Sequence, residues 1–375
     1  MTIGVAPATD RERATQARKF MRAFAEATGL VGEGRQPTRY LWTDAFAVCN
    51  FLALGETALA LRLVDQVHRT LGRRDARHGD GDRWLSGLDD ELAAEHPTWG
   101  GLRIGKKLAE RSEHEAFDEG LEWDRDGQYF HYLTKWMHAL DQVARSTREA
   151  RFNVWARELA EVAYRAFTYV PVHGSGRRMV WKMSVDLTRP LVPSMGLHDP
   201  LDGYITFRQL QASAVLLDVA NVGPSLAVEA AELGALIPDD LSTTDPLGVG
   251  GLLADAWRSE QLLRENALSS PVLRDRLIDA SVPGLEVFRA GVALPQPASF
   301  RLAFRELGLA IGLAAVPLLD RSAEELAEFV PLREDIEAFW LEPLNRRSST
   351  WLDHEHINAV MLATSLAPEG YLTLR

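Results

Sequence analysis

Residues 127–140 read GQYFHYLTKWMHAL, and their apolar side chains recur at the spacing of an α-helix. Polar side chains interrupt the pattern at His131, Lys135 and His138, which lie at positions i, i+4 and i+7. Residues at this spacing share one face of a helix. We therefore predict an inner helix whose polar stripe faces a wet or polar cavity. The alternative is that these are core histidines, satisfied by hydrogen bonds from neighbouring groups.

Segments of the same apolar kind recur along the whole chain. They begin near residues 40, 128, 204, 248, 299 and 351, and amphipathic helical stretches separate them. A helix that is apolar on every side must be buried, whereas an amphipathic helix covers it with one face. This alternation predicts an all-α fold, an (α/α)6 barrel in which helical hairpins form a toroid. We expect one domain over residues 1–375.

Two long segments, residues 72–127 and 169–203, interrupt the helical pattern. The first is rich in glycine and charge but holds three tryptophans, which argue against disorder. In the second, residues 178–186 alternate between polar and apolar side chains in the manner of a strand. We expect both segments to lie over the pocket, with short β-hairpins within them.

The composition excludes several classes of function. The chain has 375 residues and a formal net charge of −12, so a broad surface for nucleic-acid phosphates is not expected. A single cysteine, Cys49, rules out an internal disulfide and a cysteine-based zinc site. The longest apolar run is shorter than the roughly 20 residues that a membrane span needs. We expect a soluble, cytoplasmic protein without nucleic-acid or membrane partners, and oligomers are possible.

A second polar group precedes the apolar helix that begins near residue 204. Residues 193–204 read PSMGLHDPLDGY and place His198, Asp199 and Asp202 at the amino end of that helix. Loops that are held by a rigid scaffold often carry reactive groups. Aspartate and proline are also ordinary residues at a helix start, so a capping role stays open.

Other candidates lie elsewhere along the chain. His354 and His356 precede or open the last apolar helix, but their spacing is not that of a zincin, and we predict no metal. Trp42 and Asp44 open the first apolar helix, while residues 99–106 (WGGLRIGK) are glycine-rich without matching a phosphate loop. The acidic residues before the histidine helix are acid/base candidates or part of a solvated loop: Glu122, Asp124 and Asp126.

The run from Gln128 to Phe167 resembles N-acylglucosamine 2-epimerases and related sugar isomerases, which are (α/α)6 barrels. Residues 131–135 (HYLTK) look like that family's histidine-bearing helix, and residues 156–160 (ARELA) like the helix after it. Residues 196–199 (GLHD) look similar to a segment that carries a catalytic histidine. Trp351 and His356 fit the family's carboxyl-terminal histidine. Lys135 stands where the family has an acidic residue.

The resemblance implies a cofactor-independent sugar isomerase or epimerase. His198 and His356 would then act as base and acid, because histidine titrates near working pH, and His131 would hold the sugar oxygen. Further residues would contact the sugar. The cations expected to bind its hydroxyls or an anionic group are Arg103, Lys135 and Lys182. The aromatic rings expected to stack on the sugar are those of Trp42, Trp99 and Trp181. Additional substrate-binding candidates are Asp44, His138, Asp199, Asp202 and His354.

Two alternatives stay open. A glycoside hydrolase in the same pocket would need two carboxylates, with Asp44, Asp124, Asp199 and Asp202 as candidates. A sugar- or partner-binding protein without catalysis would need neither facing histidines nor paired carboxylates. Facing histidines would favour isomerisation, and paired carboxylates would favour hydrolysis.

Overall fold

A computed structural model describes residues 9–32, 36–75, 81–174, 176–291, 294–320 and 325–375, so residues 76–80 of the first long segment lie outside the described part. The contacts divide the chain into two compact units. One comprises residues 1–27, 49–56 and 240–374, and the other comprises residues 28–48 and 57–239 together with Arg375. Helix α2 (Leu41–Ala53) contributes residues to both. The expectation of one domain stays a prediction.

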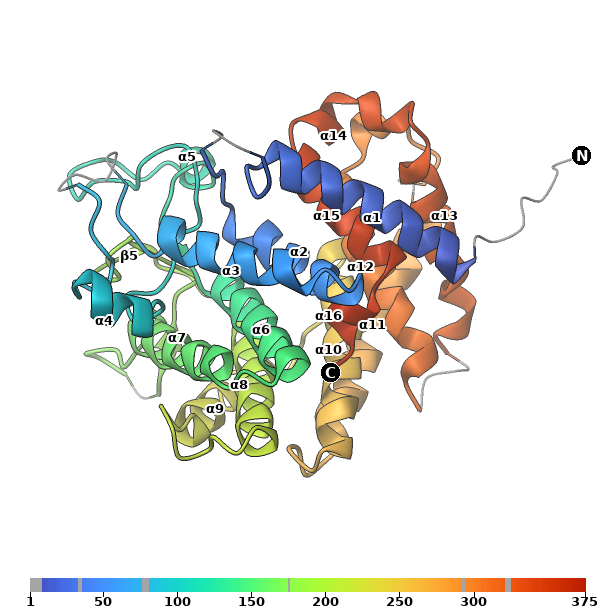
Figure 1. Ribbon diagram of the computed structural model, residues 1–375. Coiled ribbons are helices and arrows are strands. Elements are labelled where there is room, and N and C mark those ends of the chain that lie inside the picture. The colour runs from blue at the N-terminus through green and yellow to red at the C-terminus, as the bar shows by residue number, and fades with distance from the viewer. Residues whose placement is uncertain (1–8, 33–35, 76–80, 175, 292–293, 321–324) are drawn as a thin grey trace, which may run out of the picture. The chain divides into compact units, whose positions relative to one another are not determined.

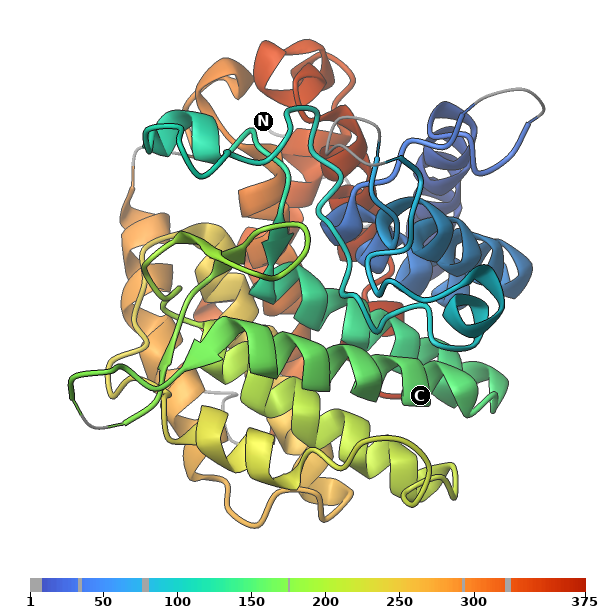
Figure 2. The same ribbon diagram turned by 90° about the vertical axis from the view of Figure 1, so that its left-hand side faces the viewer.

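The unit of residues 28–48 and 57–239 contains the histidine helix. Helix α6 (Phe130–Thr147) packs against α7 (Arg151–Phe167) and α8 (Asp199–Leu216), and α8 packs against α9 (Ala227–Gly234) (Figures 1 and 2). Helix α3 (Thr57–Leu71) also contacts α6. Most of α6 is buried, whereas α3 and α7 bury one face each. The predicted alternation of apolar and amphipathic helices is confirmed in this unit.

Short strands and helices occupy the two long segments of this unit. Strands β1 (Gln128–Tyr129), β4 (Lys182–Met183) and β5 (Pro190–Val192) form an antiparallel sheet in the order β1-β4-β5. Strands β2 (Thr168–Tyr169) and β3 (Arg178–Met179) pair separately. Two short helices, α4 (Asp90–Glu95) and α5 (Glu119–Glu122), are each preceded by an aspartate, Asp89 and Asp118, whose side chain accepts a backbone N–H of the first turn. The β-hairpins expected within residues 169–203 are therefore present.

The other unit follows the same alternation. Helix α10 packs against α11 and α12, α12 packs against α13 and α15, and α1 packs against α15 (Figure 1). The bounds of these helices are α1 (Asp10–Ala27), α10 (Pro246–Arg264), α11 (Val272–Ala290), α12 (Ala303–Ala315), α13 (Pro331–Leu341), α14 (Ser349–Leu352), α15 (Glu355–Leu366) and α16 (Glu369–Leu372). Short 3-10 turns flank them at Ala298–Phe300, Val316–Leu318, Ala327–Phe329 and Asn345–Arg347.

Glycines allow α10 and α12 to approach each other closely. A Cβ atom on Gly250 would collide with the backbone of Gly308, and one on Gly312 would collide with the backbone of Gly250. Because glycine has no side chain, the two helix backbones meet without a spacer at this crossing. The fully buried apolar residues of both helices pack around it.

The predicted helix starts differ from the structure by four or five residues at α8, α12 and α15. The sequence pattern predicts a helix from Tyr204, whereas α8 begins at Asp199. Proline at the second position suits the first turn of a helix because its missing N–H has no intrahelical acceptor there. Asp199 and Asp202 therefore belong to the first turn of α8 and not to the preceding loop.

Candidate functional site

Two rungs of polar side chains connect α6 to the first turn of α8. Lys135 Nζ lies 2.9 Å from Asp202 Oδ1, and His131 Nδ1 lies 3.9 Å from Asp199 Oδ1. The match follows from helix geometry, since residues four apart on α6 and three apart on α8 each share a face. Both aspartates also lie at the positive end of the α8 dipole, which favours their charged forms.

His131 and Asp199 line a cavity of about 400 Å³. The side chain of His131 is 33% exposed, whereas that of Asp199 is 7% exposed. The wall combines aromatic, aliphatic and acidic groups from both long segments. Its other described residues are Phe117, Glu119, Glu122, Trp123, Trp181, Val192, Ser194, Met195 and Gly196.

Burial decides the protonation of Asp199. Burial and, to a smaller extent, the neighbouring negative charge of Asp202 raise the pKa of this carboxyl to about 7. The backbone N–H of Gly196, 3.2 Å away, and the charge of Lys135 oppose the rise only in part. A large fraction of Asp199 is therefore protonated near neutral pH, where an ordinary aspartate is ionised.

The neighbouring imidazole is shifted in the opposite sense. Desolvation lowers the pKa of His131 to about 4, and the charge of Lys135 lowers it too, while Asp202 acts against them. The Tyr132 ring stands perpendicular to the imidazole at 4.6 Å. The ring of His131 is therefore neutral at pH 7, and one of its nitrogens is free of a proton. A neutral base beside a protonated acid is an arrangement suited to acid/base catalysis.

Two tryptophans form an aromatic platform at this cavity. The rings of Trp123 and Trp181 stack with centroids 5.0 Å apart and 26° between their planes. Trp123 is 54% exposed, and the indole N–H of Trp181 donates to Ser194 Oγ at 3.1 Å. Exposed indole faces offer apolar contact to the flat face of a ring-shaped ligand. Trp181 was predicted as a stacking residue, whereas Trp123 carried no signal beyond its residue type.

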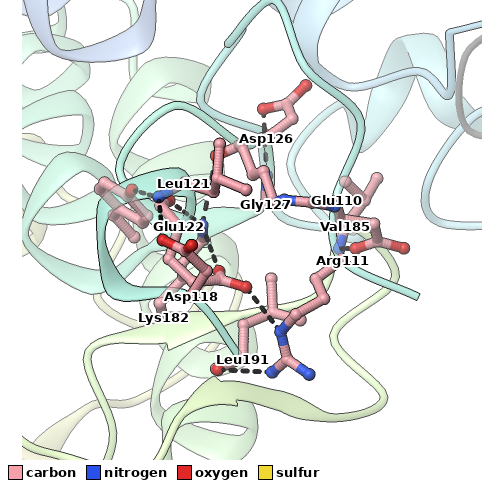
Figure 3. Close-up of polar contacts among 12 residues, drawn as sticks. Glu110, Arg111, Asp118, Leu121, Glu122, Asp126, Gly127, Lys182, Val185 and Leu191 are labelled. Carbon is pink, nitrogen blue, oxygen red and sulfur yellow. Dashed lines mark hydrogen bonds and ion pairs between the residues drawn. The ribbon is translucent and has the colours of Figure 1, made fainter. Parts of the chain in front are cut away.

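A buried charge cluster surrounds Glu122, which is one of the residues of the cavity wall (Figure 3). Lys182 is fully buried and donates from Nζ to Glu122 Oε2 at 2.9 Å and to the Glu122 backbone oxygen at 2.6 Å. Arg111 donates to Glu122 Oε1 at 2.6 Å and to the Leu191 backbone oxygen at 2.9 Å. Both carboxylate oxygens of Glu122 are thus held by cations, and the cluster ties α5 to strands β4 and β5.

Three predicted substrate-binding residues occupy buried polar networks. Arg103 donates to Asp126 Oδ2 at 2.9 Å, and Lys182 belongs to the cluster described above. His138 is fully buried with Nδ1 3.1 Å from Gln209 Oε1. The contact of His138 matches the alternative of core histidines satisfied by neighbouring groups, and the two cations are likewise paired within the protein. In the described residues, none of the three lines the cavity.

Trp42, Asp44 and Trp99 also lie apart from the described cavity wall. Trp42 is buried and packs on Phe46 at 4.7 Å. Burial raises the pKa of Asp44 to about 6, against the opposing effects of the Arg39 charge and the Tyr40 backbone N–H. Trp99 stacks on the ring of His96 at 4.2 Å and is 46% exposed.

The remaining predicted histidines are placed differently. His198 is the residue before α8, is half-buried, and does not line the cavity among the residues that the structure describes. His354 and His356 belong to the other unit, where their rings contact Phe304 at 5.5 Å and Phe24 at 6.2 Å. The catalytic roles assigned to His198 and His356 stay predictions.

Comparisons with known proteins support the architecture. No protein-family model matches the chain, and no curated protein sequence matches it. Its structure is nevertheless similar to solved (α/α)6 barrels, so the predicted fold class, all-α with few short strands, is confirmed. No helix in the described residues is long and apolar enough to cross a membrane.

Three solved structures are similar to this chain. A GH76 α-mannanase from Bacteroides thetaiotaomicron has a TM-score of 0.55 and 8% identity, covering 95% of this chain and 96% of that one. A sugar epimerase from a ruminal bacterium has a TM-score of 0.53 and 10% identity, covering 94% and 98%. Cellobiose 2-epimerase from Bacillus thermoamylovorans has a TM-score of 0.49 and 11% identity, covering 87% of each chain. At these identities the likeness concerns the fold.

Proposed function

We propose that this protein is a cofactor-independent sugar isomerase or epimerase that works by acid/base catalysis in the cavity of His131 and Asp199. The observation that carries the proposal is the neutral imidazole of His131, 3.9 Å from a carboxyl whose raised pKa of about 7 lets it hold a proton near neutral pH, at one wall of this cavity. The stacked pair of the exposed Trp123 and the half-buried Trp181 suits the face of a pyranose ring. The mannanase and the sugar epimerase that share the fold are sugar enzymes by name.

The proposed chemistry is proton abstraction next to a sugar carbonyl. His131 takes the proton of the C–H bond, whose electron pair moves to form an enediol. The carbonyl oxygen takes the proton of Asp199 as its double bond becomes a single bond. His131 then returns a proton to either carbon, or to the other face of the same carbon, while one enediol hydroxyl gives its proton back to Asp199 as its C–O bond becomes a carbonyl, which completes isomerisation or epimerisation. The charge of Lys135, whose Nζ lies 2.9 Å from Asp202 Oδ1, lowers the pKa of Asp199 and so stabilises the carboxylate that remains after Asp199 gives up its proton.

The first test is proton exchange on free sugars. Aldoses and ketoses incubated with the protein in D₂O should gain deuterium next to the carbonyl, which NMR detects. We expect His131→Gln to slow the exchange about 10²- to 10⁴-fold, the usual contribution of a general base. His114→Gln is the matched control because His114 is exposed and outside the cavity wall. If no sugar exchanges, or if His131→Gln exchanges at the wild-type rate, the proposal fails.

The histidine roles implied by the family resemblance are tested in the same assay. His198 and His356 were predicted as base and acid. His198→Gln and His356→Gln should each retain exchange activity if His131 and Asp199 carry the chemistry. Loss of exchange in these variants, with His131→Gln active, would restore the roles that the resemblance implies.

Glycoside hydrolysis is the second candidate, and Asp199 is the observation that favours it. A general acid of a glycosidase needs a raised pKa, and the pKa of Asp199 is raised to about 7 by burial and by the charge of Asp202. Release of reducing ends from manno- or gluco-oligosaccharides, abolished by Asp199→Asn and without deuterium exchange, would select hydrolysis. Saturable sugar binding with neither reaction would select the third alternative, a binding protein.

A further inference from the structure

A second cavity of about 400 Å³ lies in the same unit, among helices α3, α4 and α7. It shares no described residue with the His131 cavity. Its floor is apolar and includes Leu61, Val64 and Pro97. His68, which is only 4% exposed, also lines it. This cavity plays no part in the proposed sugar chemistry. We therefore ask which ligand its lining residues would bind.

The hydrogen bond of His68 determines its tautomer. The indole N–H of Trp136 donates to His68 Nε2 at 3.2 Å. Because an indole nitrogen only donates, Nε2 must be unprotonated and Nδ1 must carry the hydrogen of the neutral ring. Burial keeps the ring neutral by lowering its pKa to about 3. No described residue accepts the Nδ1 hydrogen, so this N–H is left for a ligand or solvent at the cavity.

Aromatic rings continue from His68 toward the mouth of the cavity. The Trp155 ring lies 5.4 Å from the ring of His68 and 5.2 Å from that of Phe152, with nearly perpendicular planes in both pairs. The guanidinium of Arg151 lies 4.8 Å from the centroid of Phe152 and 5.6 Å from that of Trp155. A flat apolar ligand would find both a wall and a cation here.

The described wall of this cavity carries one more cation than anions, with three arginines and two aspartates: Arg69, Arg73, Arg151, Asp65 and Asp90. Arg151 also pairs with Glu149, which lies outside that wall, at 2.7 Å. Asp90 already accepts from Arg73 at 2.5 Å and from the Trp84 indole at 2.7 Å, and Asp65 accepts from Arg69 at 2.8 Å. These ion pairs are exposed on at least one side, so they contribute little stability and their guanidiniums can turn to a ligand. A polyol would need acceptors as well as donors, whereas an anion needs donors only.

We propose that this cavity is a binding site for a small aromatic carboxylate. The ring of the ligand lies against Phe152 and Trp155. A carboxylate oxygen accepts the Nδ1 hydrogen of His68, and the guanidiniums of Arg69 and Arg151 balance its charge. The carboxylate is then the acceptor for the Nδ1 hydrogen of His68. A hydrogen bond to a charged oxygen is stronger than one to a neutral oxygen.

The test is a titration of the purified chain with phenylacetate, phenylacetamide and methyl glucoside, followed by calorimetry and by the tryptophan indole signals in NMR. We expect phenylacetate to bind at least about tenfold more tightly than phenylacetamide, a difference of about 1.4 kcal/mol. Arg151→Gln, a change of an exposed residue, and His68→Phe should each weaken phenylacetate by a similar factor. Arg165→Gln, near the other end of α7, is the matched control and should bind as wild type.

Three results would overturn the proposal. The first is that phenylacetate shows no saturable binding up to about 10 mM, a limit that corresponds to less than about 3 kcal/mol of binding free energy. The second is that phenylacetate and an uncharged probe bind equally. The third is that both Arg151→Gln and His68→Phe bind phenylacetate as tightly as wild type does. Because Arg151→Gln leaves the buried His68–Trp136 bond intact, a folding defect in His68→Phe does not remove the test.

Discussion

Replacement of Asp199 by asparagine should stabilise the fold in a manner that depends on pH. Burial raises the pKa of Asp199 from 3.8 to about 7 in the folded chain. Above pH 3.8 the unfolded chain releases this proton while the folded chain retains it, so stability falls as pH rises toward 7 and then levels. Asparagine cannot ionise, and it still accepts the backbone N–H of Gly196.

The magnitude follows from the shift. A difference of about three pKa units corresponds to at most about 4 kcal/mol at pH 8 and to about 1.6 kcal/mol at pH 5. Asp199→Asn should therefore gain roughly 2–3 kcal/mol more stability at pH 8 than at pH 5, relative to wild type. Urea unfolding at the two pH values, followed by tryptophan fluorescence, measures the difference.

Asp124→Asn is the matched control, since Asp124 is an exposed carboxylate on the loop between α5 and α6. It should change stability equally little at both pH values. A stability difference between Asp199→Asn and wild type that is the same at pH 5 and pH 8 would refute the reasoning. Asp199 would then be ionised in the folded chain, and its role as a proton donor would fail as well.

Three further predictions concern activity and packing. Deuterium exchange on a sugar should be fastest between about pH 4 and pH 7, where His131 is neutral and Asp199 still holds its proton, and a pH–rate profile without these limbs would contradict the assignment. Gly250→Ala should destabilise its unit by roughly 1–3 kcal/mol, because the added Cβ meets the backbone of α12. Thermal melts would show the loss of stability. Lys182→Met should cost about 3–5 kcal/mol in urea unfolding because Glu122 loses a buried cation, and a neutral result would show that water reaches this carboxylate.

Much of the helical framework could be predicted because helix formation leaves a local trace. The spacing of apolar residues located α6 and α7 to within a few residues, and it placed His131 and Lys135 on one face. The same spacing placed His138 on that face, yet the structure buries it against Gln209. Periodicity tells which residues share a face, but not how far along the helix that face stays open to a cavity.

The partners of the charged residues could not be predicted in this way. Arg103 and Lys182 suit an anionic or hydroxylated ligand by residue type, but they form buried ion pairs with Asp126 and Glu122, 23 and 60 positions away in the chain. Likewise, Trp123 and Trp181 come together from two separate long segments. No local pattern records these distances, because long segments of irregular backbone connect them.

The sequence by itself determined the helices, their apolar and amphipathic alternation and therefore the fold class, because each of these depends on residues a few positions apart. Only the tertiary structure decided that His131 lies near Asp199, that their pKa values shift in opposite directions, and that His68, whose Nδ1 hydrogen has no acceptor among the described residues, lines a second cavity. Desolvation and pairing depend on what packs around a group, and that is a property of contacts between segments distant in the chain.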